Sequence, residues 1–342
     1  MSQEPSESNV VPAGRVLVTG ATGFVGRYVV RELIARGYSP VCLARDPEKV
    51  RSLLGADLAS RVVAVRGDLF DAGALARAAD GCSAVIHLVG IILQRRLTGQ
   101  TFRRIHVEGT RRVVAAAVRA SIRRYVHMSA LGSRPDAPAE YHRTKWQAEQ
   151  IVRQSGKPSP HALSTAVEAR PGGGLDWTIF RPSLIHGPDG EFMQMMKFFC
   201  TSRLRQPFMP YFGTGLARIQ PIDVRDVAAC FVKALALPET IGRAYDLVGP
   251  ERFTWKELYD VCALILTGRK RLKLSVPVGA ARLAARTIVP LLPSLLVPFK
   301  FDAGQVLMSQ EDSIADARII EQTFGLHLRD FRTELSRYAD LL

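Results

Sequence analysis

Residues 16–26 read Val-Leu-Val-Thr-Gly-Ala-Thr-Gly-Phe-Val-Gly, and this stretch decides the fold. Its apolar start predicts a buried strand, and Gly20, Gly23 and Gly26 follow that strand and open a helix. In this context the first glycine permits a tight turn, the second lets the backbone approach a pyrophosphate, and the third lets the helix pack on the sheet. The positive end of the helix then faces the phosphates. The stretch therefore predicts a dinucleotide-binding turn, whose candidate binding residues are Gly20, Thr22, Gly23, Phe24 and Val25.

The N-terminal half alternates short apolar runs with helical stretches. The expected strands are 16–19, 41–44, 62–65, 84–88, 125–128 and 177–180, and the expected helices include 25–36, 101–120 and 141–154. This alternation implies right-handed crossovers and a doubly wound parallel sheet, so we expect an α/β protein with a Rossmann domain over residues 14–181. Residues 1–13 are expected to be a disordered leader, and the Pro-, Gly- and Ser-rich 155–174 an inserted loop. Residues 182–342 are expected to form a smaller, mostly helical substrate-capping domain that can return strands to the sheet.

Charge and cysteine content exclude several classes of partner. The net charge is +14, but the arginines are spread along the chain and no nucleic-acid-binding motif accompanies them, so we expect no nucleic acid partner. The five cysteines are scattered, without the paired spacing of a metal site or a disulfide framework. They fit a reducing compartment. We therefore expect a cytoplasmic protein without a metal, and leave open that it sits at the inner face of a membrane.

The end of the second expected strand distinguishes NAD from its phosphorylated form. NAD-binding sites usually place an acid there to hold the ribose hydroxyls, whereas an arginine nearby accommodates a 2′-phosphate. Here Ala44 stands where the acid is expected, and Arg45 is placed to pair with a phosphate. Asp46 before Pro47 is typical of a helix N-cap. We therefore expect NADP(H) in preference to NAD(H).

Several further motifs extend the pattern over nearly the whole chain. They are Arg66-Gly-Asp68-Leu69, Val85-Ile-His-Leu-Val-Gly90, His106-Val-Glu-Gly-Thr110, Tyr141-His-Arg-Thr-Lys145, Phe180-Arg-Pro-Ser183 and Asp223-Val-Arg-Asp226-Val-Ala. Together they resemble the short-chain dehydrogenase/reductase superfamily, on the extended or atypical side that includes NAD-dependent epimerases and dehydratases. The sequences of three segments are most similar to the branch that contains the nicotinamide-binding accessory subunit of respiratory complex I; these segments are 88–91, 141–145 and 174–188.

The resemblance implies roles for further residues. Asp68 and Leu69 should contact the adenine, and Leu88, Val89 and Gly90 should flank the ribose and phosphate. Pro182 and Ser183 should lie beside the nicotinamide. These positions complete the expected cofactor site.

Tyr141 and Lys145 are the candidate catalytic pair. They lie four residues apart on an expected helix, so both side chains share one face. An ammonium nearby lowers a tyrosine pKa, which lets the phenol act as a general acid or base. The resemblance implies these roles, adds that Lys145 binds the nicotinamide ribose, and places Ser129 in the catalytic set. However, Ala130 stands where active relatives carry a second hydroxyl that polarises the substrate carbonyl.

Two helices bear on partners and substrate. In 101–120, His106 shares the sheet-facing side and is interpreted as a core histidine, whereas Arg104, Arg111, Arg112 and Arg119 fall on the outer side. In dimeric relatives this outer surface joins a four-helix bundle between subunits, and an arginine-rich surface opposes that packing. We therefore expect a monomer or a docked subunit. Phe192, Met195, Met196 and Phe199 recur at helical spacing, either as core packing or as the wall of an apolar pocket.

Residues 280–299 are apolar, but three prolines and two arginines argue against a membrane-spanning helix. Packing within the small domain is the default interpretation, and a surface-lying amphipathic segment is the alternative.

These observations favour an NADP(H)-dependent oxidoreductase acting on an apolar, quinone- or isoprenoid-like carbonyl or hydroxyl substrate. One alternative is a non-catalytic, cofactor-binding structural or assembly subunit of a membrane redox complex. Another is a sugar-nucleotide epimerase or dehydratase. The missing hydroxyl at Ala130 and the short run from Ser129 to Tyr141 count against that last class.

Overall fold

The computed structural model describes residues 14–95, 98–156, 174–202, 208–289, 291 and 300–342. At its centre is a seven-stranded parallel sheet with the strand order β11–β6–β5–β4–β1–β2–β3. Its strands are β1 (Arg15–Thr19), β2 (Ser39–Ala44), β3 (Val63–Arg66), β4 (Cys82–His87), β5 (Arg124–Met128), β6 (Asp176–Pro182) and β11 (Arg243–Leu247). The expected parallel sheet is confirmed.

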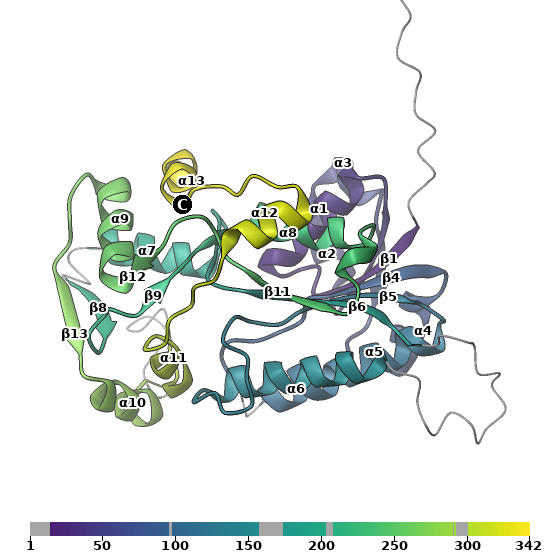
Figure 1. The fold of residues 1–342 in the computed structure, drawn as a ribbon, viewed down its shortest axis with the longest axis horizontal. Coiled ribbons are helices and arrows are strands. Elements are labelled where there is room, and N and C mark those ends of the chain that lie inside the picture. Colours follow the sequence, from purple (N-terminus) through teal and green to yellow (C-terminus); the bar gives the residue numbers. More distant parts are fainter. Residues whose placement is uncertain (1–13, 96–97, 157–173, 203–207, 290, 292–299) are drawn as a thin grey trace, which may run out of the picture.

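Helices cover both faces of this sheet (Figure 1). One face carries α1 (Phe24–Ala35), α2 (Pro47–Leu54), α8 (Val224–Ala234) and α12 (Ala317–Phe324), with the short α3 (Ala56–Ala59) beside α2. The other carries α4 (Ala72–Ala79), α5 (Gly109–Arg119) and α6 (Glu140–Ser155). The predicted Rossmann-type doubly wound fold is thereby confirmed.

The central strands explain why the sequence shows continuous apolar runs instead of alternation. Val16 and Val18 belong to the core beneath α1 and α8, whereas Leu17 between them belongs to the core beneath α4 and α5. All three side chains are fully buried. Because both faces of a parallel sheet are covered by helices, successive positions in such a strand are mostly apolar.

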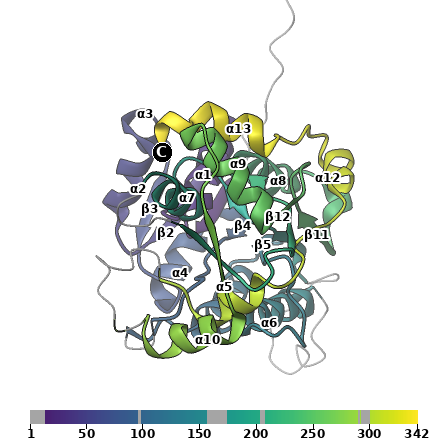
Figure 2. The same cartoon turned by 90° about the vertical axis from the view of Figure 1, so that its left-hand side faces the viewer.

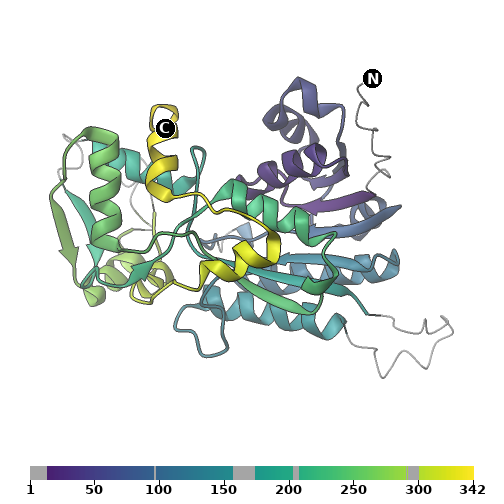
Figure 3. The ribbon, with the colours of Figure 1, turned by 45° about the horizontal axis from the view of Figure 1, so that its top comes forward.

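The C-terminal half runs outward from the sheet and back twice. Its outer elements are β7 (Ile185–His186), α7 (Glu191–Thr201), β8 (Met209–Phe212), β9 (Arg218–Ile219), β10 (Ile222–Asp223), β12 (Phe253–Thr254), α9 (Trp255–Thr267), β13 (Lys273–Val276), α10 (Val278–Thr287), α11 (Ala303–Met308), α13 (Phe331–Tyr338) and η4 (Ala339–Leu341). The short η3 (Pro238–Thr240) lies instead between α8 and β11, against β5 and β6. Figure 3 shows the two returns: green α8 and yellow α12 lie against the sheet, and the outer lobe lies to the left. α8 packs on α1, α12 packs on α8 and β11, and β11 joins the sheet beside β6.

The expected strands and helices are found with small shifts at their ends. The helix expected over 101–120 begins with a π-helical segment, η2 (Arg103–Glu108), before α5. The leader 1–13 and most of the expected insertion, 157–173, lie outside the described residues. Within the described ranges, no helix is long and apolar enough to cross a bilayer. The same ranges hold no cluster of His, Cys, Asp or Glu suited to a metal ion, and the five cysteines are free and buried.

Candidate active site

The glycine turn forms a cradle of backbone atoms at the start of α1. Gly20 has φ of +83°, a conformation that glycine adopts without strain. Gly23 donates its N–H to the Gly20 carbonyl at 3.0 Å and is the N-cap of α1. A Cβ on Gly26 would overlap that same carbonyl. In this described segment no side chain caps the helix and no acid occupies its first turn, so the first N–H groups are available to an anion.

This cradle lies where the strand order reverses, between β1 and β4. Leu88 donates its N–H to the carbonyl of Thr19 at 3.1 Å, which brings the loop after β4 against the end of β1. A Cβ on Gly20 would lie 3.2 Å from the amide nitrogen of Val89. Open α/β sheets bind ligands at this reversal, beyond the carboxyl ends of the strands. The residues expected to hold the pyrophosphate and the ribose thus meet at one edge.

The residues expected around the adenosine lie at the ends of β2 and β3. Arg45 follows buried Ala44 and is exposed, with no ion pair among the residues described. Asp46 is the N-cap of α2 and accepts the Glu48 N–H at 3.1 Å, as expected. Asp68 accepts the N–H groups of Phe70 and Asp71 at 2.7 and 3.1 Å, which fixes the neighbouring turn. Next to Asp68, Leu69 is buried beneath Gly109, where a Cβ would come within 2.8 Å of its Cδ1.

Lys145 projects from α6 towards the cofactor edge and is only 2% exposed. Its Nζ donates to the carbonyl of Met128 at 2.9 Å, at the end of β5. A Cβ on Gly90 would lie 2.9 Å from the same Nζ, so the ammonium lies directly against the Gly90 backbone. Burial lowers the pKa of Lys145 to about 8, while the negative charge of Glu149 opposes the shift. The ammonium therefore lies between the loop after β4 and the end of β5.

Tyr141 begins the same helix face and is held by two rings. Phe102 and His106 meet it edge-on, with ring centroids at 5.8 and 5.5 Å. Burial raises the pKa of Tyr141 to about 12, opposite to the lowering expected from Lys145. The physical reason is that desolvation of the phenolate dominates while the ammonium is directed at the Met128 carbonyl. Tyr141 and Lys145 share a helix face, as predicted. The predicted lowering of the Tyr141 pKa is wrong, because burial raises this pKa instead.

His106 links the loop after β4 to α6. Its Nδ1 lies 2.9 Å from the Thr144 hydroxyl, and its Nε2 accepts the Ile91 N–H at 3.1 Å. The Thr144 hydroxyl in turn reaches the Tyr141 carbonyl at 2.9 Å. Burial keeps the pKa of His106 well below its ordinary value, so the ring is neutral. As interpreted from the sequence, it is a hydrogen-bonded core histidine, and here it also positions Tyr141.

Ser129 is held by a buried ion pair that sequence reasoning missed. Its hydroxyl donates to Glu149 at 2.6 Å, and Glu149 accepts from Nε and Nη2 of Arg181 at 2.7 and 2.6 Å. Glu149 is fully buried and lies two helical turns after Tyr141, roughly 12 Å along the axis. No hydrogen bond joins Ser129 to Tyr141 within the described structure. One feature of the sequence could have indicated this contact: Glu149 is an acid four residues after Lys145, on the same helix face.

The residues expected near the nicotinamide lie at the end of β6. Pro182 is buried, and Ser183 donates its N–H to the Leu247 carbonyl at 2.9 Å. The hydroxyls of Ser183 and Ser313 are 2.9 Å apart, so this edge contacts the segment leading into α12. The expected cofactor residues from β1, β4, α6 and β6 therefore share the carboxyl edge of the sheet.

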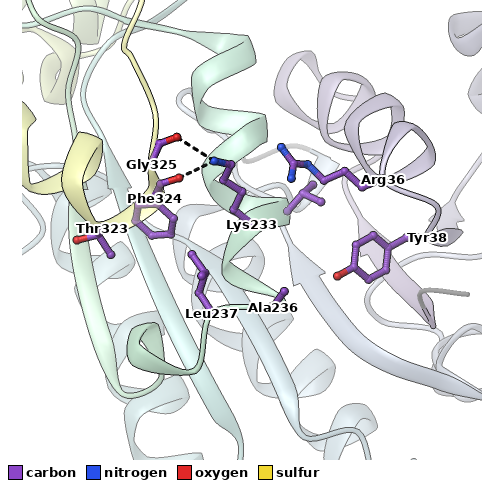
Figure 4. A pocket seen from close by; sticks show the side chains of 9 residues that line it. Arg36, Tyr38, Lys233, Ala236, Leu237, Thr323, Phe324 and Gly325 are labelled. Carbon is purple, nitrogen blue, oxygen red and sulfur yellow. Dashed lines mark hydrogen bonds between the residues drawn. The ribbon is translucent and has the colours of Figure 1, made fainter. Parts of the chain in front are cut away.

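A separate groove of about 550 Å³ lies at the far end of α1 (Figure 4). Arg36, Tyr38, Leu237 and Phe324 line it, and Lys233 there donates to the carbonyls of Phe324 and Gly325 at 2.6 and 3.1 Å. It opens at the amino edge of the sheet, where β2 begins. It is therefore not part of the candidate active site.

The fold and its glycine cradle define a dinucleotide-binding α/β protein. The chain belongs to the NAD-dependent epimerase/dehydratase family, within the short-chain dehydrogenase/reductase superfamily, and the family pattern matches residues 16–247. This confirms the resemblance of the sequence motifs. Family membership and the fit of the cradle both support binding of a nicotinamide dinucleotide.

Named relatives include reductases and subunits of a respiratory enzyme. Ceramide reductase of Caulobacter vibrioides is 32% identical over 261 residues, covering 76% of this chain and 73% of that protein. Mitochondrial NADH dehydrogenase (ubiquinone) 1 alpha subcomplex subunit 9 of Dictyostelium discoideum is 29% identical over 266 residues. That match covers 77% of this chain and 66%, just under two thirds, of the subunit.

Experimental structures share the fold. The dTDP-glucose 4,6-dehydratase of Streptomyces venezuelae, solved with NAD bound, superposes with a TM-score of 0.68 at 22% identity. The superposition covers 96% of each chain. The outer C-terminal lobe is therefore part of a shared architecture and not an addition to it.

Proposed function

We propose that the protein is an NADP(H)-dependent oxidoreductase that reduces the carbonyl of an apolar, long-chain or isoprenoid-like substrate, or oxidises the corresponding alcohol. The observation that carries this proposal is the placement of Tyr141 and Lys145. Both come from one face of α6; Lys145 lies against Gly90, and Tyr141 packs on His106, which accepts the Ile91 N–H in the loop after β4.

Each residue of the set has a defined task. The bound dinucleotide supplies the hydride in reduction and accepts it in oxidation. Tyr141 Oη delivers the proton that completes the alcohol, or removes it in the reverse direction. Lys145 Nζ has three donors and uses one on the Met128 carbonyl, which leaves others for the ribose hydroxyls. Ser129 is a positioning residue, because its proton is engaged by Glu149.

Arg45 supports the preference for the phosphorylated cofactor. Its guanidinium is exposed at the end of β2, Ala44 occupies the position where NAD sites usually carry an acid, and Asp46 caps α2. A planar guanidinium binds phosphate bidentately, whereas NAD sites usually offer a carboxylate to the ribose hydroxyls. The charge and position of Arg45 suit a 2′-phosphate.

The substrate class rests on α7 and on a relative. Met196 is fully buried in the core of the outer lobe, whereas Phe192, Met195 and Phe199 are half-buried against that core. α7 follows β6 and β7 in the chain, and the accessible surface of these side chains would supply apolar contact area to a substrate. The relative named ceramide reductase acts, by its name, on a long-chain lipid. An apolar chain beside a reducible carbonyl is the substrate we infer for this protein.

The test is NADPH oxidation with ketones of increasing chain length. Wild type is expected to consume NADPH faster as the chain lengthens, and Tyr141→Phe is expected to lose at least 100-fold in kcat while it still binds NADPH. Tyr38→Phe, at the other end of α1, is the matched control and should behave as wild type. Equal rates for Tyr141→Phe and wild type would remove Tyr141 from the chemistry.

A second function is favoured by one observation. Ala130 offers no hydroxyl, and Ser129 is engaged by Glu149, so no donor from this pair is free to polarise a carbonyl. A cofactor-holding subunit of a redox complex needs none, and a relative carries the name of such a subunit. Ligand at 100 times its dissociation constant would stabilise the fold by about 2.7 kcal/mol without turnover. This function is supported if Gly26→Ala prevents complex assembly in cells whereas Tyr141→Phe has no effect on growth or on NADPH oxidation.

A further inference from the structure

The far end of the outer lobe exposes an unusual number of large apolar side chains. Of the thirteen that are exposed among the residues described, six lie between residues 264 and 291. They are Leu264, Leu272, Leu274, Leu283, Ile288 and Leu291. Leu272, Leu283 and Leu291 are 73%, 64% and 83% exposed. We call this surface, with its basic residues Arg269, Lys270, Arg282 and Arg286, the end face.

The elements of the end face lie at one extremity of the molecule. Figure 2 looks directly at it, with β13 running from α9 towards α10. Within the described residues β13 pairs only with β8; exposed Leu274 lies in β13, and exposed Leu272 directly precedes it. α10 buries Ala281 and Ala285 and exposes Leu283. Exposed apolar area of this kind marks an interaction surface when it is contiguous and rimmed by polar groups.

The charged residues within the segment that forms the end face are all basic. Residues 261–301 contain no aspartate or glutamate and seven lysines or arginines. The acid that precedes this run, Asp260, binds Lys273 at 2.5 Å and Lys270 at 3.7 Å. Arg269 and Arg286 are exposed. Leucines set among arginines, without acids, are the pattern of surfaces that lie in the headgroup region of anionic bilayers.

The end face is connected through α11 to the segments on either side of Tyr141 in the chain. α10 packs on α11, whose N-cap is Asp302; burial raises the pKa of Asp302, and the charge of Glu140 adds to the rise. Arg134, in the loop before Tyr141, forms an ion pair with Glu311 just after α11. α11 therefore connects the end face to the loop and the helix start that carry Tyr141.

We propose that the end face docks the protein on an anionic phospholipid bilayer, with its leucines in the interface and its arginines at the headgroups. A second copy of the chain is a poorer occupant, because a two-fold contact would oppose like arginines across it. Docking does not depend on turnover. If the substrate is apolar, as proposed above, docking would also hold the protein at a bilayer in which that substrate dissolves.

The test is co-sedimentation of the full chain with vesicles of phosphatidylcholine alone or with 30% phosphatidylglycerol. Wild type is expected to bind only the anionic vesicles, and to release as salt rises because screening weakens headgroup contacts. Leu283→Glu should lower the partition coefficient about tenfold or more, because it removes an inserted leucine and adds a repelled charge. Arg286→Glu should lower it by a similar factor.

Matched controls lie elsewhere on the surface. Leu341 is as exposed as Leu272, at 73%, so Leu341→Ser is the control for Leu272→Ser. Arg119→Glu on α5 is the control for Arg286→Glu. The proposal is overturned if wild type ignores anionic vesicles, or if the end-face variants and their controls bind alike. It is also overturned if Leu283→Glu splits a dimer measured by light scattering. Since NADPH oxidation is measured separately, failure here leaves the proposed reaction standing.

Discussion

The cofactor side and the substrate side of the candidate active site are built from different parts of the peptide. On the cofactor side, Gly20, Gly23 and Gly26 place backbone N–H groups and a helix terminus where an anion can meet them. On the substrate side, side chains are tied to one another, as Ser129 is to Glu149 and Glu149 to Arg181. A backbone cradle depends on glycine alone, so its signature is short and local. A side-chain network depends on residues far apart in sequence, and its chemistry cannot be inferred from any one of them.

The largest expected effect is on the cofactor side. Gly26→Ala would place a Cβ into the Gly20 carbonyl, a clash with backbone that no side-chain rotation relieves. We expect dinucleotide affinity to fall more than 100-fold, or the chain to fail to fold. Titration of intrinsic fluorescence with NADPH measures it. Gly279→Ala, in α10 with open space around it, is the control and should be neutral. If Gly26→Ala bound NADPH as tightly as wild type, the backbone cradle would not be what holds the cofactor.

The next effect is on the substrate side. Glu149→Ala leaves the guanidinium of Arg181 without its bidentate partner and frees the hydroxyl of Ser129. Removing one member of a buried pair costs about 3 kcal/mol of unfolding free energy. Urea denaturation measures the loss. Glu48→Ala, which breaks a pair on the exposed surface of α2, should cost less than about 1 kcal/mol. Equal losses in the two variants would mean that the network contributes nothing beyond a surface ion pair.

A smaller effect sharpens the cofactor side. Arg45→Ala should reduce the preference for NADPH over NADH by about tenfold, because one exposed charge-assisted contact is lost. The readout is the ratio of the two dissociation constants by calorimetry. Arg51→Ala, on the neighbouring helix, should leave the ratio unchanged. An unchanged ratio in Arg45→Ala would assign the 2′-substituent to another residue.

The smallest effect concerns a histidine beneath the substrate side. Neither ring nitrogen of buried His127 has a hydrogen-bond partner in the described structure, and burial holds its pKa well below the ordinary 6.5. Only the unfolded chain binds this proton as pH falls below about 6.5, so acid lowers stability. His127→Phe should raise unfolding free energy by about 1 kcal/mol at pH 7 and flatten its decline towards pH 5. A destabilised variant would reveal an unrecognised partner for the ring.

The fold could be predicted because its signals are local. The strand-turn-helix at residues 16–26 and the apolar runs identified the sheet, and Asp46-Pro47 identified an N-cap. The direction of the Tyr141 pKa could not be predicted, since it depends on how much solvent the folded chain removes. Nor could the role of Ser129, because its partner Glu149 is twenty residues away and Arg181 arrives from β6. The sequence showed part of the end face only as an apolar stretch. That its leucines are exposed follows from the packing of α10 and β13 in the structure.

The most direct test of the central claim is amide hydrogen exchange of the full chain with and without NADPH. The cradle at the carboxyl edge is expected to bind the dinucleotide, so protection should increase in residues 20–26 and 88–92 and at the start of α6. The groove at the amino edge, lined by Arg36, Lys233 and Phe324, should exchange at an unchanged rate. Protection confined to that groove, or no protection at saturating NADPH, would contradict the account.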